Sequence, residues 1–153
     1  MINVDVLSED NNWLKKIKKK KDFFHKVCKA FPTKYQFINK KIFLTLLLSN
    51  NKNIKKLNKQ FRNKNKSTNI LSFPIKRKIK LENNSYLGDI IISFNYMDKP
   101  KKQKVKIFKY KVIKTFIHGF LHLLGFDHIK LKDYKKMAKE EQTIYLSVIK
   151  KIN

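Results

Sequence analysis

The chain is poor in cysteine, proline and glycine. Its single cysteine, Cys28, excludes an internal disulfide and fits a reducing cytosol. No Gly/Ser-rich linker divides the chain, and its N-terminus lacks the basic and apolar regions of a signal peptide. The longest apolar run, near residues 42–48, is far too short to span a membrane. We therefore expect a cytoplasmic protein without membrane attachment.

Acidic residues are also scarce, so the chain is strongly basic. It has 37 lysines and arginines against 11 aspartates and glutamates, which gives a formal net charge of +26. A surplus of this size favours polyanionic partners, above all nucleic acid. However, 35 of the 37 cations are lysines, and asparagine and isoleucine are abundant, a bias typical of an A/T-rich coding sequence. The charge alone therefore leaves two interpretations open, a nucleic-acid partner and a coding bias.

The pattern of apolar residues predicts one folded domain over residues 1–153. Hydrophobic residues make up 42% of the chain, which is enough for a core. Their spacing predicts three or four strands, near residues 4–6, 42–48, 70–73 and 87–93, with a weak extension at Ile79 and Leu81. It also predicts four helices, over residues 13–31 up to Pro32, 54–62, 105–124, and onward from a cap at Asp133. The mixed order of these elements indicates a single layered α/β or α+β domain.

Histidine and glycine are scarce except in one short segment. Three of the four histidines and two of the three glycines lie between His118 and His128. His118 and His122 are four residues apart, so on a helix they project from one face, one turn apart. Gly125 is well placed to end that helix as a left-handed residue. The chain can then turn back and bring His128 to the other two.

Three histidines in this arrangement predict a catalytic metal site. They can occupy three corners of a tetrahedron and leave the fourth for water, whereas structural zinc sites are closed by four protein ligands. We therefore expect a metal-dependent hydrolase with one Zn²⁺ per chain, bound by His118, His122 and His128. His25 lies alone among lysines and is interpreted as an ordinary histidine.

The spacing is similar to that of the metzincin proteases, in which a glutamate follows the first histidine and acts as the general base. Here Gly119 takes that position, so the pattern counts against proteolysis. Met137 could be mistaken for the Met-turn residue of those proteases. We interpret it as one of the apolar packing positions of the last helix.

The complete motif resembles that of the YbeY family, which comprises bacterial endoribonucleases implicated in rRNA maturation and ribosome quality control. The likeness covers about residues 40–150, with a weaker match before it. Beyond the histidines it rests on four further matches in the same order: Leu57-Asn58-Lys59-Gln60-Phe61-Arg62, Ser67-Thr68-Asn69-Ile70-Leu71-Ser72-Phe73-Pro74, Leu87-Gly88-Asp89-Ile90, and Met137 with Glu141. Phe61 and Asn69 depart from the family's usual tyrosine and aspartate, but no departure touches the histidines.

The resemblance implies a mixed sheet of about four strands flanked by helices, zinc at the three histidines and a functional, catalytic Arg62. It also implies a single-strand-specific endoribonuclease with RNA, in particular rRNA and the ribosome, as its partner, and no DNA. The residues agree on Arg62, which stands at a predicted helix end beside a polar loop in a chain with two arginines. A guanidinium grips phosphate bidentately, which an ammonium cannot; a plain surface cation is the alternative. For Asp89, a carboxylate that orients a ligand histidine and a residue that bounds a strand both stay open.

Two other functions also remain open at this stage. One is a metal hydrolase that acts on another substrate, such as peptides. The other is a ribosome-binding assembly factor in which zinc is mainly structural. Because no glutamate adjoins the histidines, the sequence does not identify a general base, and attack by a ribose 2′-hydroxyl is as compatible with it as attack by water.

Overall fold

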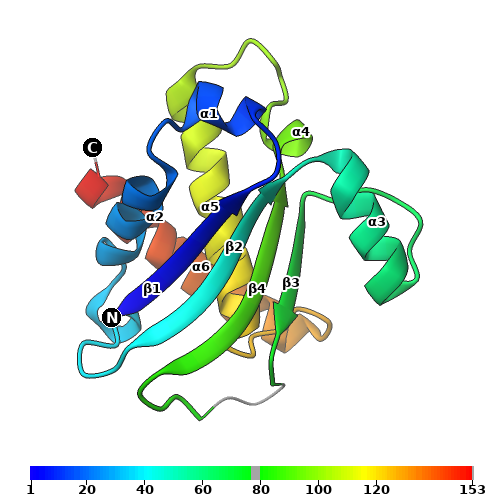
Figure 1. The fold of residues 1–153 in the computed structure, drawn as a ribbon. Coiled ribbons are helices and arrows are strands. Elements are labelled where there is room, and N and C mark those ends of the chain that lie inside the picture. Colours follow the sequence, from blue (N-terminus) through cyan, green and yellow to red (C-terminus); the bar gives the residue numbers. More distant parts are fainter. Residues whose placement is uncertain (77–79, 153) are drawn as a thin grey trace.

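The strands form one mixed four-stranded sheet in the computed structural model, which describes residues 1–76 and 80–152 (Figure 1). The strand order is β1-β2-β4-β3. Strands β1, β2 and β4 run parallel, and β3 pairs antiparallel with β4 at the edge. The bounds are β1 Ile2–Ser8, β2 Ile42–Ser49, β3 Ile70–Pro74 and β4 Ser85–Ser93. The predicted α/β class and the mixed sheet of four strands are confirmed.

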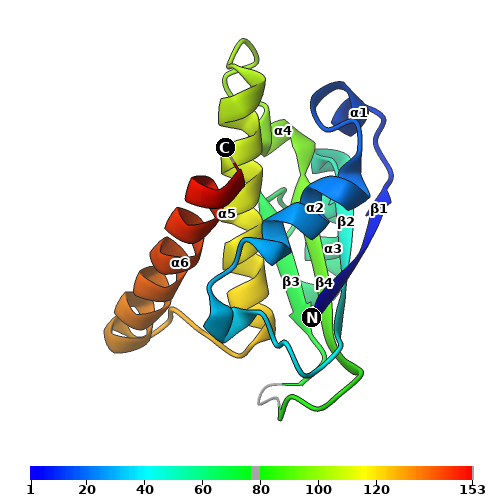
Figure 2. The same ribbon diagram turned by 90° about the vertical axis from the view of Figure 1, so that its left-hand side faces the viewer.

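The helices cover the sheet unequally. Most of them lie on one face of the sheet, which Figure 2 shows edge-on. Helix α3 covers part of the other face, beside β3 and β4. Alternation along β2 explains the arrangement, because Ile42, Leu44 and Leu46 point into the main core while the residues between them are partly exposed. The helices are α1 Asn12–Lys16, α2 Lys20–Lys29, the 3₁₀ turn η1 Thr33–Tyr35, α3 Asn51–Arg62, α4 Phe94–Met97, α5 Val105–Leu123 and α6 Leu131–Ile152.

Helix α5 is the central helix of the fold. It contacts β3 and β4 on one side and α6 on the other, and its Phe108, Phe116 and Phe120 are fully buried. It ends at Leu123, two residues before Gly125, whose φ of +96° is the predicted left-handed conformation. Met137 of α6 is buried in the same core, which confirms its packing role.

The first predicted helix is divided in the structure. The single helix expected over residues 13–31 is divided into α1 and α2 because Ile17 is extended (φ −130°, ψ 97°). Ile17 and Trp13 are both buried at this bend, and the Trp13 indole donates to the Ser49 carbonyl at 2.8 Å, so tertiary contacts override the helical spacing. The second helix then ends at Lys29, before Pro32.

Asp133 does not cap the last helix, because α6 begins two residues earlier and Asp133 lies within its first turn. There a carboxylate still complements the positive helix end. Leu81 lies outside the strands, and the rest of the weak extension predicted at Ile79 falls outside the described residues. Within residues 1–76 and 80–152, no helix combines the length and apolar character needed to cross a bilayer.

Candidate metal centre

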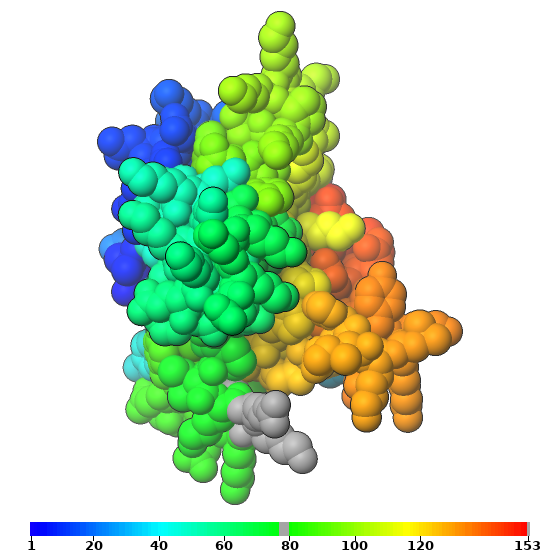
Figure 3. Space-filling view, turned by 90° about the vertical axis from the view of Figure 1, so that its right-hand side faces the viewer, coloured from blue at the N-terminus to red at the C-terminus, as the bar shows by residue number. Residues whose placement is uncertain are grey.

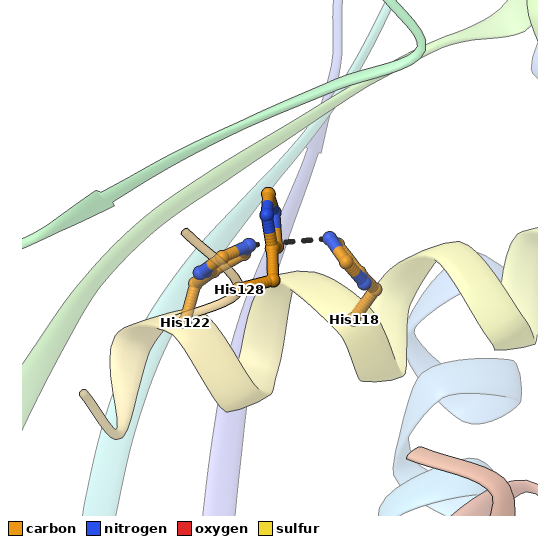
Figure 4. A group of neighbouring side chains, drawn as sticks. All are labelled: His118, His122 and His128. Carbon is orange, nitrogen blue, oxygen red and sulfur yellow. Dashed lines mark hydrogen bonds between the residues drawn. The ribbon is translucent and has the colours of Figure 1, made fainter. Parts of the chain in front are cut away.

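The three predicted histidines converge at the C-terminal end of α5 (Figure 4). His118 and His122 project from one face of the helix, and His128 reaches them from the segment that follows Gly125. One nitrogen from each ring lies within 4.8 Å of the other two. The Nε2 atoms of His118 and His122 are only 3.1 Å apart. The local sequence explains this convergence, since a four-residue spacing aligns two rings and a left-handed glycine returns the chain.

Hydrogen bonds fix how the two helical rings face the centre. Nδ1 of His122 lies 3.0 Å from the Phe126 carbonyl, which can only accept, so Nδ1 carries the proton. Nδ1 of His118 lies 3.3 Å from Oε2 of Glu141 in α6, and a carboxylate likewise accepts. In its neutral form, each ring therefore presents an unprotonated Nε2 towards the centre.

This donor set fits a metal ion. Two Nε2 lone pairs that face each other at 3.1 Å repel unless a proton or a metal ion lies between them. Burial lowers the pKa of His122, and the neighbouring His118 lowers it further, so the neutral form that binds metal is favoured. Neutral imidazole suits zinc and other transition metals. The three histidines could therefore hold one ion, with Glu141 and the Phe126 carbonyl orienting two of the rings.

The absence of a side chain at Gly119 has a steric reason. A Cβ atom at this position would lie 2.7 Å from Cδ1 of Ile70, 3.0 Å from Oγ of Ser72 and 3.1 Å from Cγ2 of Ile90. Helix α5 approaches β3 and β4 this closely because position 119 is glycine. A glutamate in the metzincin position would have to fit into the same space, so the packing agrees with the sequence in opposing a metzincin mechanism.

Arg62 and the histidines line the same cleft. The cleft has a volume of about 1150 Å³ and runs between the end of α3, the following loop and residues 125–129. Nη2 of Arg62 donates to the Ser72 carbonyl at 2.8 Å, and the guanidinium lies over the Phe73 ring at 5.5 Å. These two contacts hold an exposed guanidinium in place. The loop lysines Lys64 and Lys66 also line the cleft.

Asp89 does not orient a ligand histidine. Its neighbour Ile90 packs against α5 at Gly119, so alternation along β4 turns Asp89 to the opposite face of the sheet, where its carboxylate accepts from the Tyr86 hydroxyl. Glu141 stands beside His118 instead. In the sequence, only the match of Glu141 to the family pattern indicated a role for this residue. Its contact with His118 depends on how α6 packs on α5.

Comparison with known proteins yields a consistent set of matches. A family model described as Endoribonuclease YbeY matches residues 6–148. Curated proteins named Endoribonuclease YbeY include one from Pelagibacter ubique, which is 61% identical over 99% of both chains. Another, from Buchnera aphidicola, is 36% identical over 97% of this chain and 90% of the relative. A solution structure of a Thermotoga maritima protein matches with a TM-score of 0.58 and 23% identity, over 95% of this chain and 88% of that one, which supports the fold alone.

Proposed function

Because the chain belongs to the endoribonuclease YbeY family, we propose that it is a zinc-dependent endoribonuclease that cuts single-stranded RNA. We assign it to rRNA maturation and ribosome quality control in the cytoplasm, with rRNA and the ribosome as partners. Residues 1–153 act as one hydrolase domain, and neither DNA nor a membrane is a partner. The net charge of +26 supports a polyanionic substrate.

One observation carries this proposal. Three histidine nitrogens within 4.8 Å of one another lie at a cleft that also contains Arg62. A metal site that shares a cleft with an oriented guanidinium suits a phosphodiester, whose charge grows in the transition state. A peptide has no such charge before attack, and the general base of the metzincin proteases is absent at Gly119.

His118, His122 and His128 would hold the zinc ion. When bound, zinc supplies a Lewis acid that polarises oxygen at neutral pH. Glu141 and the Phe126 carbonyl keep the Nε2 atoms of two histidines directed at the centre.

Arg62 binds the phosphate of the substrate. A guanidinium has five N–H donors, and the Ser72 carbonyl takes one of them. Because the Phe73 ring and that carbonyl already hold the group, little side-chain freedom is lost when it binds phosphate. Lys64 and Lys66 contact the RNA backbone further along the cleft.

Analysis of the product ends tests the proposal. The zinc-loaded protein is incubated with a defined single-stranded RNA, with DNA of the same sequence and with the paired RNA duplex. We expect cleavage of the single-stranded RNA alone. A 2′,3′-cyclic phosphate end would identify the ribose 2′-hydroxyl as the nucleophile, whereas a 5′- or 3′-monophosphate without a cyclic precursor would identify water. Intact RNA alongside tight binding to ribosomes would contradict the proposal and favour an assembly factor.

A further inference from the structure

Three large apolar side chains are exposed between the last histidine and the first turn of α6. Ile129 is 86% exposed, Leu131 70% and Tyr134 56%. Within the described part of the chain, none of the three belongs to either hydrophobic cluster. We call these three residues the apolar lip. Neighbouring exposed apolar residues are typical of binding surfaces.

One end of the apolar lip, Ile129, adjoins the histidine cluster. Ile129 follows His128 in the chain and lines the cleft. Leu131 begins α6, and Tyr134 stands three residues later on the same helical face. In Figure 3 this orange segment projects from the body of the molecule, away from the teal and green segment that contains α3. A nucleotide whose phosphate lies at the histidines therefore places a neighbouring base within reach of the lip.

Positive charges alternate with the apolar side chains. Lys130 and Lys132 are exposed on either side of Leu131, and one acid, Asp133, lies in the segment. Proteins that bind single-stranded nucleic acid combine cations for the phosphates with apolar or aromatic surfaces on which bases stack. A duplex keeps its bases paired and stacked, so this surface suits an unpaired base. Three side chains give too little area for a stable protein interface, which buries about 800 Å² on each partner.

We propose that the apolar lip is a subsite for one unpaired nucleobase beside the cleaved phosphate. The inference rests on the proposed endoribonuclease function and gives a physical basis for single-strand preference. Lys130 and Lys132 hold the flanking phosphates, while Ile129 and Tyr134 contact the base.

A cycle of protein and RNA changes tests the subsite. In the RNA, single abasic ribonucleotides replace each position on either side of the cleavage point. In the protein, Ile129→Ser and Tyr134→Ser shorten the lip. We expect one abasic position to weaken RNA binding by the metal-free wild type, and cleavage by the zinc-loaded form, about tenfold. The same abasic change should have little further effect on either variant, because each already lacks a side chain on which the base would stack.

The controls distinguish a specific loss of the apolar lip from a general loss of structure or of metal binding. Ile38→Ser removes another exposed apolar side chain, 72% exposed, that does not line the cleft. This variant should bind and cut RNA like the wild type. Zinc content should be unchanged in all variants. If the abasic nucleotide still weakens RNA binding and cleavage about tenfold in Ile129→Ser and Tyr134→Ser, the proposed subsite is wrong. The proposed endoribonuclease function would not be affected by that result. A wild type that neither binds nor cuts RNA would overturn the proposed function, and the subsite with it.

Discussion

Nδ1 of His118 lies 3.3 Å from Oε2 of Glu141, so a carboxylate from α6 orients a histidine on α5. If the histidines bind zinc, Glu141→Ala should lower zinc affinity about 10- to 100-fold, the usual effect of losing such a carboxylate. Competition with a chelator measures the change. Glu140→Ala is the matched control, because Glu140 pairs with Lys34 and Tyr35 instead. Equal zinc affinity in wild type and Glu141→Ala would show that the carboxylate does not support the metal.

Gly119→Ala should destabilise the protein even though alanine favours helices. Helix propensity alone would stabilise the variant by about 1 kcal/mol. Overpacking against Ile70 and Ser72 destabilises the same variant by about 1–3 kcal/mol, because a Cβ would lie 2.7 Å from Cδ1 of Ile70. We expect a net loss of up to about 2 kcal/mol in urea unfolding. The loss should shrink in an Ile70→Val background, which lacks Cδ1. A more stable Gly119→Ala protein would show that the sheet and helix can separate at little cost.

Arg62→Ala should leave zinc content and the midpoint of thermal unfolding nearly unchanged but reduce RNA cleavage by about 100-fold, the scale of losing one transition-state donor. Arg62→Lys should recover only part of the rate, since it keeps the charge but loses the planar fork. Rates are compared at saturating RNA, so weaker binding does not obscure the result. Full activity in Arg62→Ala would mean that the guanidinium only ties α3 to β3.

The metal-free protein should lose stability as pH falls through the histidine range. Burial lowers the pKa of His122 in the folded state, so below about pH 6.5 the unfolded chain takes up a proton that folded His122 resists. This contribution is present above that pH and is lost as pH falls towards the folded pKa. Urea unfolding near pH 5 and near pH 7.5 measures it. His122→Gln, which keeps a donor for the Phe126 carbonyl but does not titrate, should flatten the dependence; an unchanged pH dependence would assign it to other groups.

The cleft lysines should contribute more to RNA binding than those of residues 15–21. Replacing Lys64 and Lys66 with Gln should reduce the slope of log affinity against log salt by roughly 0.7 for each phosphate that the protein no longer neutralises, because both residues line the cleft. Gln substitutions among residues 15–21 should leave the slope nearly unchanged if those lysines reflect coding bias. A larger effect of the residue 15–21 set would place the RNA path elsewhere.

Local spacing predicted the histidine cluster well. Two histidines four residues apart need only a helix to bring them together, and Gly125 needs only its left-handed backbone to return the chain to His128. The strand at residues 42–48 was equally predictable, because a continuous apolar run of that length suits a buried parallel strand.

The sequence pattern could not predict contacts between segments that lie far apart in the chain. The break at Ile17 arises where Trp13 meets Ser49, a partner 36 residues away. The face of the sheet to which Asp89 points depends on the register that sets Ile90 against Gly119. In the same way, Glu141 acquires its place beside His118 only when α6 packs on α5. Local spacing determines none of these three relationships.

Zinc titration of the metal-free protein, with cleavage of a defined single-stranded RNA as the readout, tests the central claim most directly. If His118, His122 and His128 bind one catalytic zinc ion, the cleavage rate should rise in proportion to added zinc and level off at about one equivalent per chain. His118→Ala should stay inactive over the same range. A metal-free protein that cuts the RNA as fast as the zinc-loaded one, or a His118→Ala variant that titrates like the wild type, would contradict the assignment.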